Sequence, residues 1–236
     1  MSALQSFFEI ILKGESKTYN DHNWYTSSGL KGFIEGRGKP PYPMLSKPLS
    51  EYTLGEIKNF QSQSRSGNGQ LWATGRYQII PKTLIGLQTE LNLPDSTKYD
   101  VATQDKMGLQ LLLNRKSIKD YLTSAVPDTK ENLEKASLAV AQVWSSVGVP
   151  YNMNGRYGAI QKNQSYYSGG GDKASVGTEI VQEKLKTLRS TFGSVSSEEK
   201  SKDQKKSKKG WIIAIVSLGA IGLGFAIYKL VKIKNK

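Results

Sequence analysis

The sequence contains no cysteine and only one histidine, His22, among its 236 residues. The absence of cysteine excludes disulfides, a thiol nucleophile and a cysteine-ligated metal site. A single histidine also argues against a histidine-based triad or a zinc site, and we interpret His22, in a polar segment, as a surface residue. We therefore expect neither a metal nor an organic cofactor.

Acidic residues are scarce relative to basic ones, with 20 aspartates and glutamates against 33 lysines and arginines, a net charge of +13. The excess is concentrated at the end of the chain. Residues 198–236 hold 10 lysines and 3 acids, or +7, which leaves +6 for the first 197 residues. A mildly basic main part suits an anionic polymer substrate without requiring one.

A signal peptide is not expected, because the N-terminus lacks a basic region and Gln5, Glu9 and Lys13 interrupt its apolar face. The long apolar run lies near the other end, at 211–231. It begins with Trp211, is uncharged up to Tyr228, and has lysines on both flanks. This length and these terminal aromatic residues predict a transmembrane helix that binds the protein to a lipid membrane.

Helical periodicity is clearest at the start of the chain, where apolar residues from Leu4 to Leu12 recur on one face of a predicted helix over 4–16. Glu15 falls at the end of this helix. A carboxylate there is disfavoured by the helix dipole, so we expect its pKa to be raised, as a general acid requires. The alternative is a solvated glutamate at a frayed helix end.

The rest of the chain predicts an α+β fold that is mainly helical, with a small β or irregular lobe. Further helices are expected at 53–60, 81–91, 101–116, 131–147 and 178–188, and short strands within 19–49. The segment 61–74 is rich in serine and glycine and predicts a flexible linker or a mobile lip over a site. We expect one domain at 1–192, a basic flexible linker at 193–210, the membrane helix at 211–231 and a basic tail at 232–236.

Four short motifs occur in a fixed order: Gly14-Glu15-Ser16, Gly75-Arg76-Tyr77-Gln78, Thr103-Gln104-Asp105 and Val143-Trp144 followed by Tyr157-Gly158. Their order and spacing resemble those of the lambda-type phage lysozymes, which are lytic transglycosylases with a lysozyme-like fold. The resemblance covers about four fifths of the chain. It implies that 1–192 is a lysozyme-like catalytic domain.

The resemblance also implies roles for individual residues. Glu15 is the expected catalytic residue, which cleaves the bond between N-acetylmuramic acid and N-acetylglucosamine in peptidoglycan. Tyr77 and Gln78 are expected to bind the sugar, and Tyr157, or Tyr151 in its place, to put a hydroxyl near Glu15. Gln104 and Asp105 are interpreted as residues of a helix start, and Trp144 as a core residue on a helix face.

A lysozyme of the hydrolytic kind needs a second carboxylate. The spacing does not choose one among Asp21, Glu35, Glu51 and Glu56, so hydrolase and transglycosylase both stay open. The rival interpretation is a non-catalytic lysozyme-like protein that binds peptidoglycan or serves as a structural virion protein.

The added membrane helix is not part of the family pattern. It favours a phage-encoded protein in a virion membrane, or in second place the host inner membrane, where it acts on the bacterial cell wall. Partners are then peptidoglycan, lipid and other virion proteins. Nucleic acid is not favoured, because the lysines flank the membrane helix.

Overall fold

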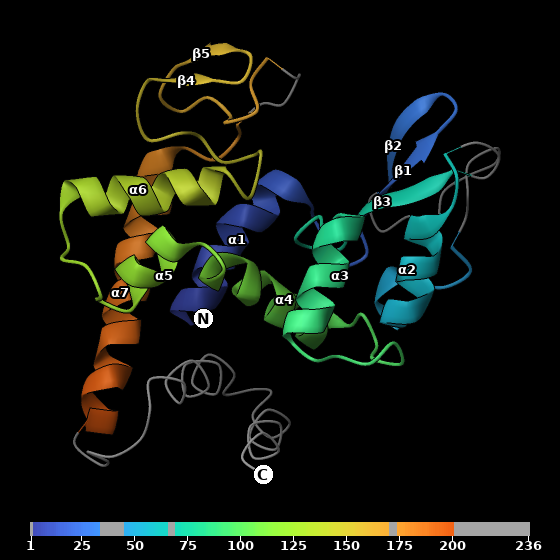
Figure 1. Cartoon of the computed structure of the whole chain (residues 1–236), viewed down its shortest axis with the longest axis horizontal. Coiled ribbons are helices and arrows are strands. Elements are labelled where there is room, and N and C mark those ends of the chain that lie inside the picture. Colours follow the sequence, from blue (N-terminus) through green and yellow to red (C-terminus); the bar gives the residue numbers. More distant parts are fainter. Residues whose placement is uncertain (1, 34–44, 66–68, 170–173, 201–236) are drawn as a thin grey trace. The chain divides into compact units, whose positions relative to one another are not determined.

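The computed structural model describes residues 2–33, 45–65, 69–169 and 174–200, about half of which are helical (Figure 1). Its sheets are small and antiparallel, so the predicted α+β class is confirmed. Among the described residues, no helix is long and apolar enough to cross a membrane. The predicted membrane helix at 211–231 and the tail at 232–236 lie outside this part of the chain.

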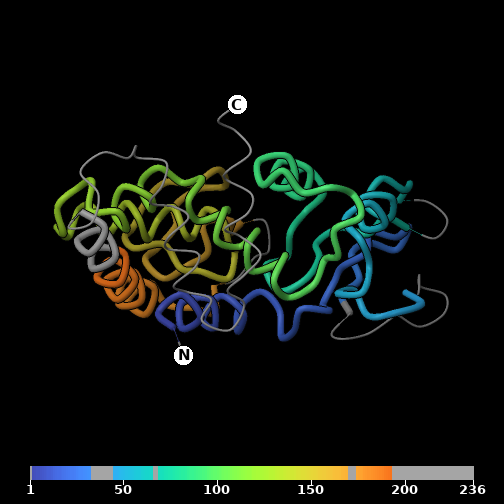
Figure 2. Tube along the Cα trace, turned by 90° about the horizontal axis from the view of Figure 1, so that it is seen from below, coloured from blue at the N-terminus to red at the C-terminus, as the bar shows by residue number. Residues whose placement is uncertain are grey.

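The described residues form two compact units. The sheet unit consists of Ile11–Arg115 and Val143–Ser146. The helical unit consists of the residues before Ile11, Lys116–Gln142 and the residues after Ser146. The first helix, α1 (Ala3–Glu15), contributes residues to both units, and in Figure 2 its blue coil near the N label gives way to a non-helical stretch.

Helix α1 confirms the predicted first helix and its end at Glu15. Its N-terminus is capped reciprocally, since the Gln5 N–H donates to Ser2 Oγ (3.1 Å) and the Ser2 N–H donates to Gln5 Oε1 (3.0 Å). Phe7 and Ile11, one turn apart, have no exposed surface. The apolar spacing therefore marks the buried face correctly.

The sheet unit is built on a three-stranded sheet of order β2-β1-β3, with strands β1 (His22–Thr26), β2 (Gly29–Phe33) and β3 (Gln70–Thr74) (Figure 1). The first two strands confirm the short strands expected within 19–49. Residues 34–44 of this segment lie outside the described residues. Trp24 and Leu71 pair in register and are both buried.

The prediction of a linker or lip over 61–74 is wrong at both ends of the segment, whereas 63–65 and Gly69 belong to no helix or strand and 66–68 lie outside the described residues. Helix α2 (Leu54–Ser62) includes its first two residues and β3 its last five. Leu71 and Ala73 are buried at alternate positions of β3. This two-residue period is the strand signal, and the serine and glycine content before it obscured the pattern.

His22 is also placed differently from the prediction of a surface residue, because only 2% of it is exposed. It is the first residue of β1, where its Nδ1 lies 2.9 Å from the carbonyl oxygen of Asn20. Its ring lies edge-on to Trp24 at 6.5 Å between centroids. The polar neighbours of His22 suggested an exposed side chain, but the strand that begins at His22 places this side chain in the interior.

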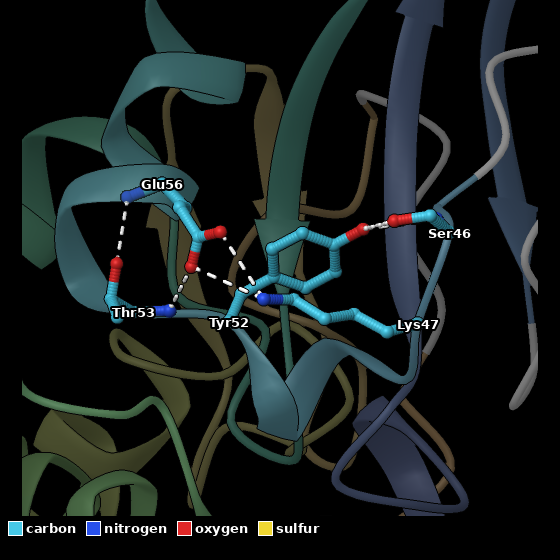
Figure 3. Close-up of polar contacts among 5 residues, drawn as sticks. All are labelled: Ser46, Lys47, Tyr52, Thr53 and Glu56. Atoms are coloured by element: carbon cyan, nitrogen blue, oxygen red, sulfur yellow. Dashed lines mark hydrogen bonds and ion pairs between the residues drawn. The ribbon is translucent and has the colours of Figure 1, made fainter.

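Helix α2 confirms the predicted helix at 53–60 and begins with a capping box. The Glu56 N–H donates to Thr53 Oγ1 (3.2 Å), and the Thr53 N–H donates to Glu56 Oε2 (2.7 Å). Lys47 adds an ion pair to Glu56 (3.1 Å), and its Nζ lies 4.3 Å from the centre of the Tyr52 ring. The backbone N–H of Ser46 donates to the Tyr52 hydroxyl, so this network fixes the segment before α2 (Figure 3).

Two further helices complete the sheet unit and confirm predictions. Helix α3 (Pro81–Glu90) begins with proline in its first turn, and α4 (Val101–Leu113) buries Met107 and Leu112. A short 3-10 turn, η1 (Leu49–Glu51), precedes α2. The N-cap of α4 is Asp100, whose carboxylate accepts from the Thr103 N–H.

The helical unit contains α5 (Lys116–Leu122), α6 (Lys130–Ala141) and α7 (Thr178–Lys200), which pack against one another (Figure 1). It also contains a hairpin of β4 (Met153–Gly155) and β5 (Gly158–Ile160). Helix α5 and the hairpin are not among the predicted elements. Both are short, and three-residue strands are too brief to show a period.

Helix α6 ends at Ala141, so the predicted helix over 131–147 is too long. Trp144 is a buried core residue as expected, with 2% exposed, but it lies beyond the helix. The cause is tertiary. The residues after Ala141 make hydrogen bonds to distant parts of the sheet unit, described below, and these override local helix propensity.

Helix α7 confirms the predicted helix at 178–188, with Val181, Leu185 and Leu188 fully buried. It continues to Lys200, so the first eight residues of the predicted flexible linker at 193–210 are helical. The remainder, 201–210, lies outside the described residues.

Candidate functional site

Glu15 is the last residue of α1, and its carboxylate is bound within the sheet unit. The backbone N–H of Ser146 donates to Glu15 Oε1 at 2.9 Å, across 131 positions of sequence. Glu15 is half-buried. The helix end is therefore not frayed, because its terminal carboxylate has a fixed backbone partner.

Ser16, the next residue, joins this helix end to the Gly75-Arg76-Tyr77-Gln78 turn. Its hydroxyl donates to the carbonyl oxygen of Arg76 at 2.9 Å. The backbone N–H of Gly75 donates in turn to the carbonyl of Asp21 (2.7 Å), in the segment that follows Ser16. Two of the four sequence motifs are thus bound directly to each other.

Gln104 binds a third motif to the same turn. Its Oε1 accepts from the Arg76 N–H (2.9 Å), and its Nε2 donates to the carbonyls of Tyr19 (3.0 Å) and Tyr99 (2.9 Å). The side chain has no exposed surface. Gly75 is required at this place, because its φ is +69° and a Cβ there would lie 2.2 Å from Gln104 Oε1.

Asp105 accepts hydrogen bonds from two tyrosines. Its Oδ1 lies 2.9 Å from the Tyr19 hydroxyl and 2.7 Å from the Tyr77 hydroxyl. The Arg76 guanidinium donates to the Tyr19 hydroxyl and lies over its ring, 4.8 Å from the centroid. The interpretation of Asp105 as part of a helix start is therefore wrong, because Asp100 caps α4 and Asp105 lies beyond its first turn.

The two tyrosines of this cluster stay protonated over the whole physiological range. Burial, followed by the neighbouring Asp105 carboxylate, raises the pKa of Tyr19 to about 12. The same two causes raise the pKa of Tyr77 still further. Both hydroxyls therefore act as permanent donors to Asp105.

Tyr77 lies in the core, with 2% of its surface exposed. Its ring fits against Gly108, where a Cβ would lie 2.7 Å from the ring, and Trp144 Nε1 donates to its carbonyl oxygen (3.3 Å). It therefore has little surface with which to contact a sugar. The segment 143–146 binds both Tyr77, through Trp144, and Glu15, through Ser146.

Gln78 is half-buried and has a φ of +48°, in the left-handed region. Its side-chain amide donates to the Gly75 carbonyl (2.9 Å) and accepts from Asn23 Nδ2 (2.6 Å) on β1. The turn motif is thereby joined to the sheet. Of the predicted sugar-binding residues in the sheet unit, Gln78 retains more accessible surface than Tyr77.

Tyr151 and Tyr157 belong to the helical unit, whereas Glu15, Tyr77 and Gln78 lie in the sheet unit. Tyr157 lies at the turn between β4 and β5 and is 58% exposed. The Arg156 guanidinium lies 5.3 Å from the centre of its ring. Tyr151 is 37% exposed.

The candidates for a second carboxylate have different environments. Asp21 is 5% exposed and accepts from the N–H groups of Lys17 (2.6 Å) and Thr18 (3.3 Å), so it shapes the turn after α1. Glu56 forms the capping box of α2. Glu51 is exposed in η1, and Glu35 lies outside the described residues.

Sequence reasoning missed Ser146 and Tyr19 and misjudged Asp105. Ser146 acts through its backbone N–H, which leaves no mark on side-chain identity. Tyr19 and Asp105 are 86 positions apart, so only the fold brings them together. Among the residues that the structure describes, no cluster of histidine, aspartate and glutamate has the arrangement of a metal site.

Comparison with known proteins yields no match: no protein-family model, no curated protein and no solved structure is significantly similar to this chain. The functional interpretation therefore depends on the motifs and on the geometry of the sheet unit.

Proposed function

We propose that this protein is a membrane-anchored lytic transglycosylase with a lysozyme-like domain, which cleaves the glycan strands of peptidoglycan. The observation that carries the proposal is the fixed position of Glu15. Its carboxylate is bound by the Ser146 N–H, and the next residue, Ser16, is bound to the Gly75–Gln78 turn. A reacting carboxylate must be held in place in this way.

In the proposed reaction Glu15, in its protonated form, donates its proton to the glycosidic oxygen as the bond from C1 of N-acetylmuramic acid breaks. The resulting carboxylate then accepts the proton of the C6 hydroxyl of the same sugar. The C6 oxygen forms a new bond to C1 and closes a 1,6-anhydro ring. One carboxylate suffices, no water is consumed, and Glu15 ends as it began.

The transglycosylase outcome is preferred to hydrolysis because of the surroundings of the other acids. Hydrolysis needs a second carboxylate at a defined separation. Asp21 and Glu56 are bound to backbone N–H groups of their own segments. These hydrogen bonds support structural roles for Asp21 and Glu56. Among the described candidates this leaves Glu51, and its substitution tests directly for a second acid.

The proposed place of action is the bacterial cell wall, with the protein held in a phage virion membrane, or in second place the host inner membrane, by residues 211–231. The lysines that flank this run support contact with anionic lipid. Removal of 211–236 is expected to move the protein from the floating membrane fraction to the bottom of the gradient in a flotation experiment. Retention in the membrane fraction would contradict the anchor.

The activity is tested by release of soluble fragments from purified peptidoglycan by the full-length protein. Glu15→Gln keeps an acceptor for the Ser146 N–H but provides no proton, so cleavage is expected to fall about 10²–10⁴-fold. Glu51→Gln is the matched control and should leave the rate unchanged. Cleavage that survives Glu15→Gln would overturn the proposal, and loss with Glu51→Gln would indicate a hydrolase.

A further inference from the structure

The sheet carries an aromatic cluster on the face opposite its buried side. Successive residues of a strand point to opposite faces. Trp24 and Leu71 are buried, and Phe60 of α2 lies 6.1 Å from Trp24 between ring centres, so this face packs against α2. Tyr25 and Trp72, each one position further along, lie on the other face and are half-buried.

These two aromatic side chains come from adjacent strands and touch each other. Tyr25 on β1 is paired with Gln70 on β3, so Trp72 is its diagonal neighbour. The ring centres are 5.1 Å apart in an edge-to-face arrangement. Two rings held in this way by a paired sheet are a preorganised apolar platform.

Arg65 adds a cation to the platform. Its guanidinium carbon lies 4.2 Å from the centre of the Tyr25 ring and 5.4 Å from that of Trp72. Arg65 Nε donates to Gln70 Oε1 (3.3 Å), and Gln70 Nε2 donates to the carbonyl of Gln61 at the end of α2 (2.6 Å). The exposed guanidinium is therefore oriented by a hydrogen-bonded chain rather than left to free rotation.

The platform is continuous with the candidate site. Asn23 lies two residues before Tyr25 on β1, about 7 Å along the strand, and its amide donates to Gln78 Oε1 (2.6 Å). Leu30, opposite Tyr25 on β2, is 50% exposed and extends the same face. A polymer bound at Gln78 can thus continue along this face of the sheet.

The chemistry of these residues selects a glycan that bears carboxylates. The C–H faces of pyranose rings are apolar and suit packing on an aromatic ring such as that of Trp72. A guanidinium stacked on a ring keeps its in-plane N–H donors for a carboxylate, which it binds through two hydrogen bonds. Among the sugars of peptidoglycan, a peptide-free N-acetylmuramic acid unit carries a free carboxylate on its lactyl group, and N-acetylglucosamine carries none.

From this we propose that Tyr25, Trp72 and Arg65 form a glycan-binding subsite, in which Trp72 packs on sugar and Arg65, stacked on the Tyr25 ring, binds the free carboxylate of a peptide-free N-acetylmuramic acid unit. The choice of glycan rests on the proposed function. The subsite binds the strand without taking part in bond cleavage, so its role can be measured separately from catalysis.

The test uses the full-length chain with Glu15→Gln, so that binding is measured without cleavage. The probes are soluble, peptide-free chains of alternating N-acetylglucosamine and N-acetylmuramic acid, and neutral N-acetylglucosamine oligomers, both titrated by calorimetry. Arg65→Ala is expected to weaken binding of the acidic glycan about tenfold and to leave the neutral one within about twofold. Trp72→Ala is expected to weaken both about tenfold.

Matched controls come from the same unit. Arg115→Ala removes an exposed arginine two residues after α4, and Ile85→Ala removes an apolar side chain that is 54% exposed on α3. Both should leave binding unchanged. Arg65→Lys keeps the charge but loses the bidentate hydrogen bonding of the guanidinium. Its affinity for the acidic glycan should therefore lie between that of Arg65→Ala and that of the chain with Arg65.

Three results would overturn the proposed subsite. In the first, Arg65→Ala binds the acidic glycan with unchanged affinity. In the second, Arg65→Ala loses equal affinity for both glycans. The third is that the Glu15→Gln chain without a further substitution binds neither glycan. Failure of the proposed function has a different signature. In that case the chain with an intact Glu15 releases no fragments, while the Arg65 and Trp72 variants still show their selective losses of binding.

Discussion

At the scale of single residues, Gly75 is the position on which the candidate site depends most. Its left-handed backbone and its closeness to Gln104 exclude a side chain. Gly75→Ala is expected to lower the free energy of unfolding by at least about 2 kcal/mol, because strain and a clash add together. Chemical denaturation monitored by circular dichroism measures this loss.

Gly86→Ala is the control for this substitution. Gly86 lies within α3, and nothing lies within 4 Å of an added Cβ. Alanine there should stabilise the protein by about 0.5–1 kcal/mol, as in any helix interior. Equal losses for both variants would contradict the account of Gly75.

His22 gives a prediction for pH dependence. Burial lowers its pKa from the usual 6.5, against smaller opposite effects of the Asn20 carbonyl and Asp21. Below pH 6.5 the His22 side chain is therefore mostly protonated in the unfolded chain but still neutral in the folded chain. Stability should fall as the pH drops from about 6.5 toward the folded pKa, by up to about 1.4 kcal/mol per pH unit.

The comparison of the parent chain with His22→Asn isolates this effect. Asparagine keeps a donor for the Asn20 carbonyl but does not titrate. Denaturation at about pH 7.5 and about pH 5.5 should show a smaller difference for the variant than for the parent chain. The same difference in both would show that His22 is not the cause.

At the scale of elements, α2 depends on its capping box. Thr53→Ala removes the acceptor of the Glu56 N–H and is expected to cost about 1 kcal/mol of stability. Thr89→Ala removes an exposed hydroxyl that bonds within α3 and should change stability by less than about 0.5 kcal/mol. Thermal unfolding of both variants checks this, and a Thr89 effect as large as that of Thr53 would contradict it.

The elements also show what the sequence could predict. The helices that bury a regular apolar stripe, such as α1 and α7, are found from their periodicity, and the capping pairs at Ser2 and Thr53 mark two helix starts. The end of α6 could not be found in this way. It is decided by hydrogen bonds from Trp144 and Ser146 to residues 67 and 131 positions away.

The features of the candidate site also fall into two groups, those that the sequence predicts and those that only the fold reveals. The end of α1 at Glu15 and the close approach at Gly75 follow from local residue types. The partners of these residues do not, because Ser146 binds through its backbone and Asp105 meets Tyr19 only in the folded chain. Side-chain identity predicts where a chemical group is placed along an element, and the tertiary fold determines what it faces.

At the scale of the whole molecule, the proposed function joins a glycan-cleaving domain to a basic membrane-binding end. The division of charge agrees with this, with +7 after Ser197 and +6 before it. If the basic tail bound nucleic acid instead of lipid, the protein would bind DNA strongly and in a salt-dependent manner, and removal of 200–209 would abolish this binding. Flotation with anionic vesicles and a DNA titration of the same full-length protein decide between the two.

The central claim is that one carboxylate, Glu15, cleaves the glycan without water. The most direct measurement is mass spectrometry of the fragments that the full-length protein releases from peptidoglycan in water enriched in heavy oxygen. If Glu15 acts alone, the fragments carry 1,6-anhydro ends that contain no solvent oxygen, and these ends vanish with Glu15→Gln. Reducing ends that carry one heavy oxygen atom would contradict the central claim and identify a hydrolase.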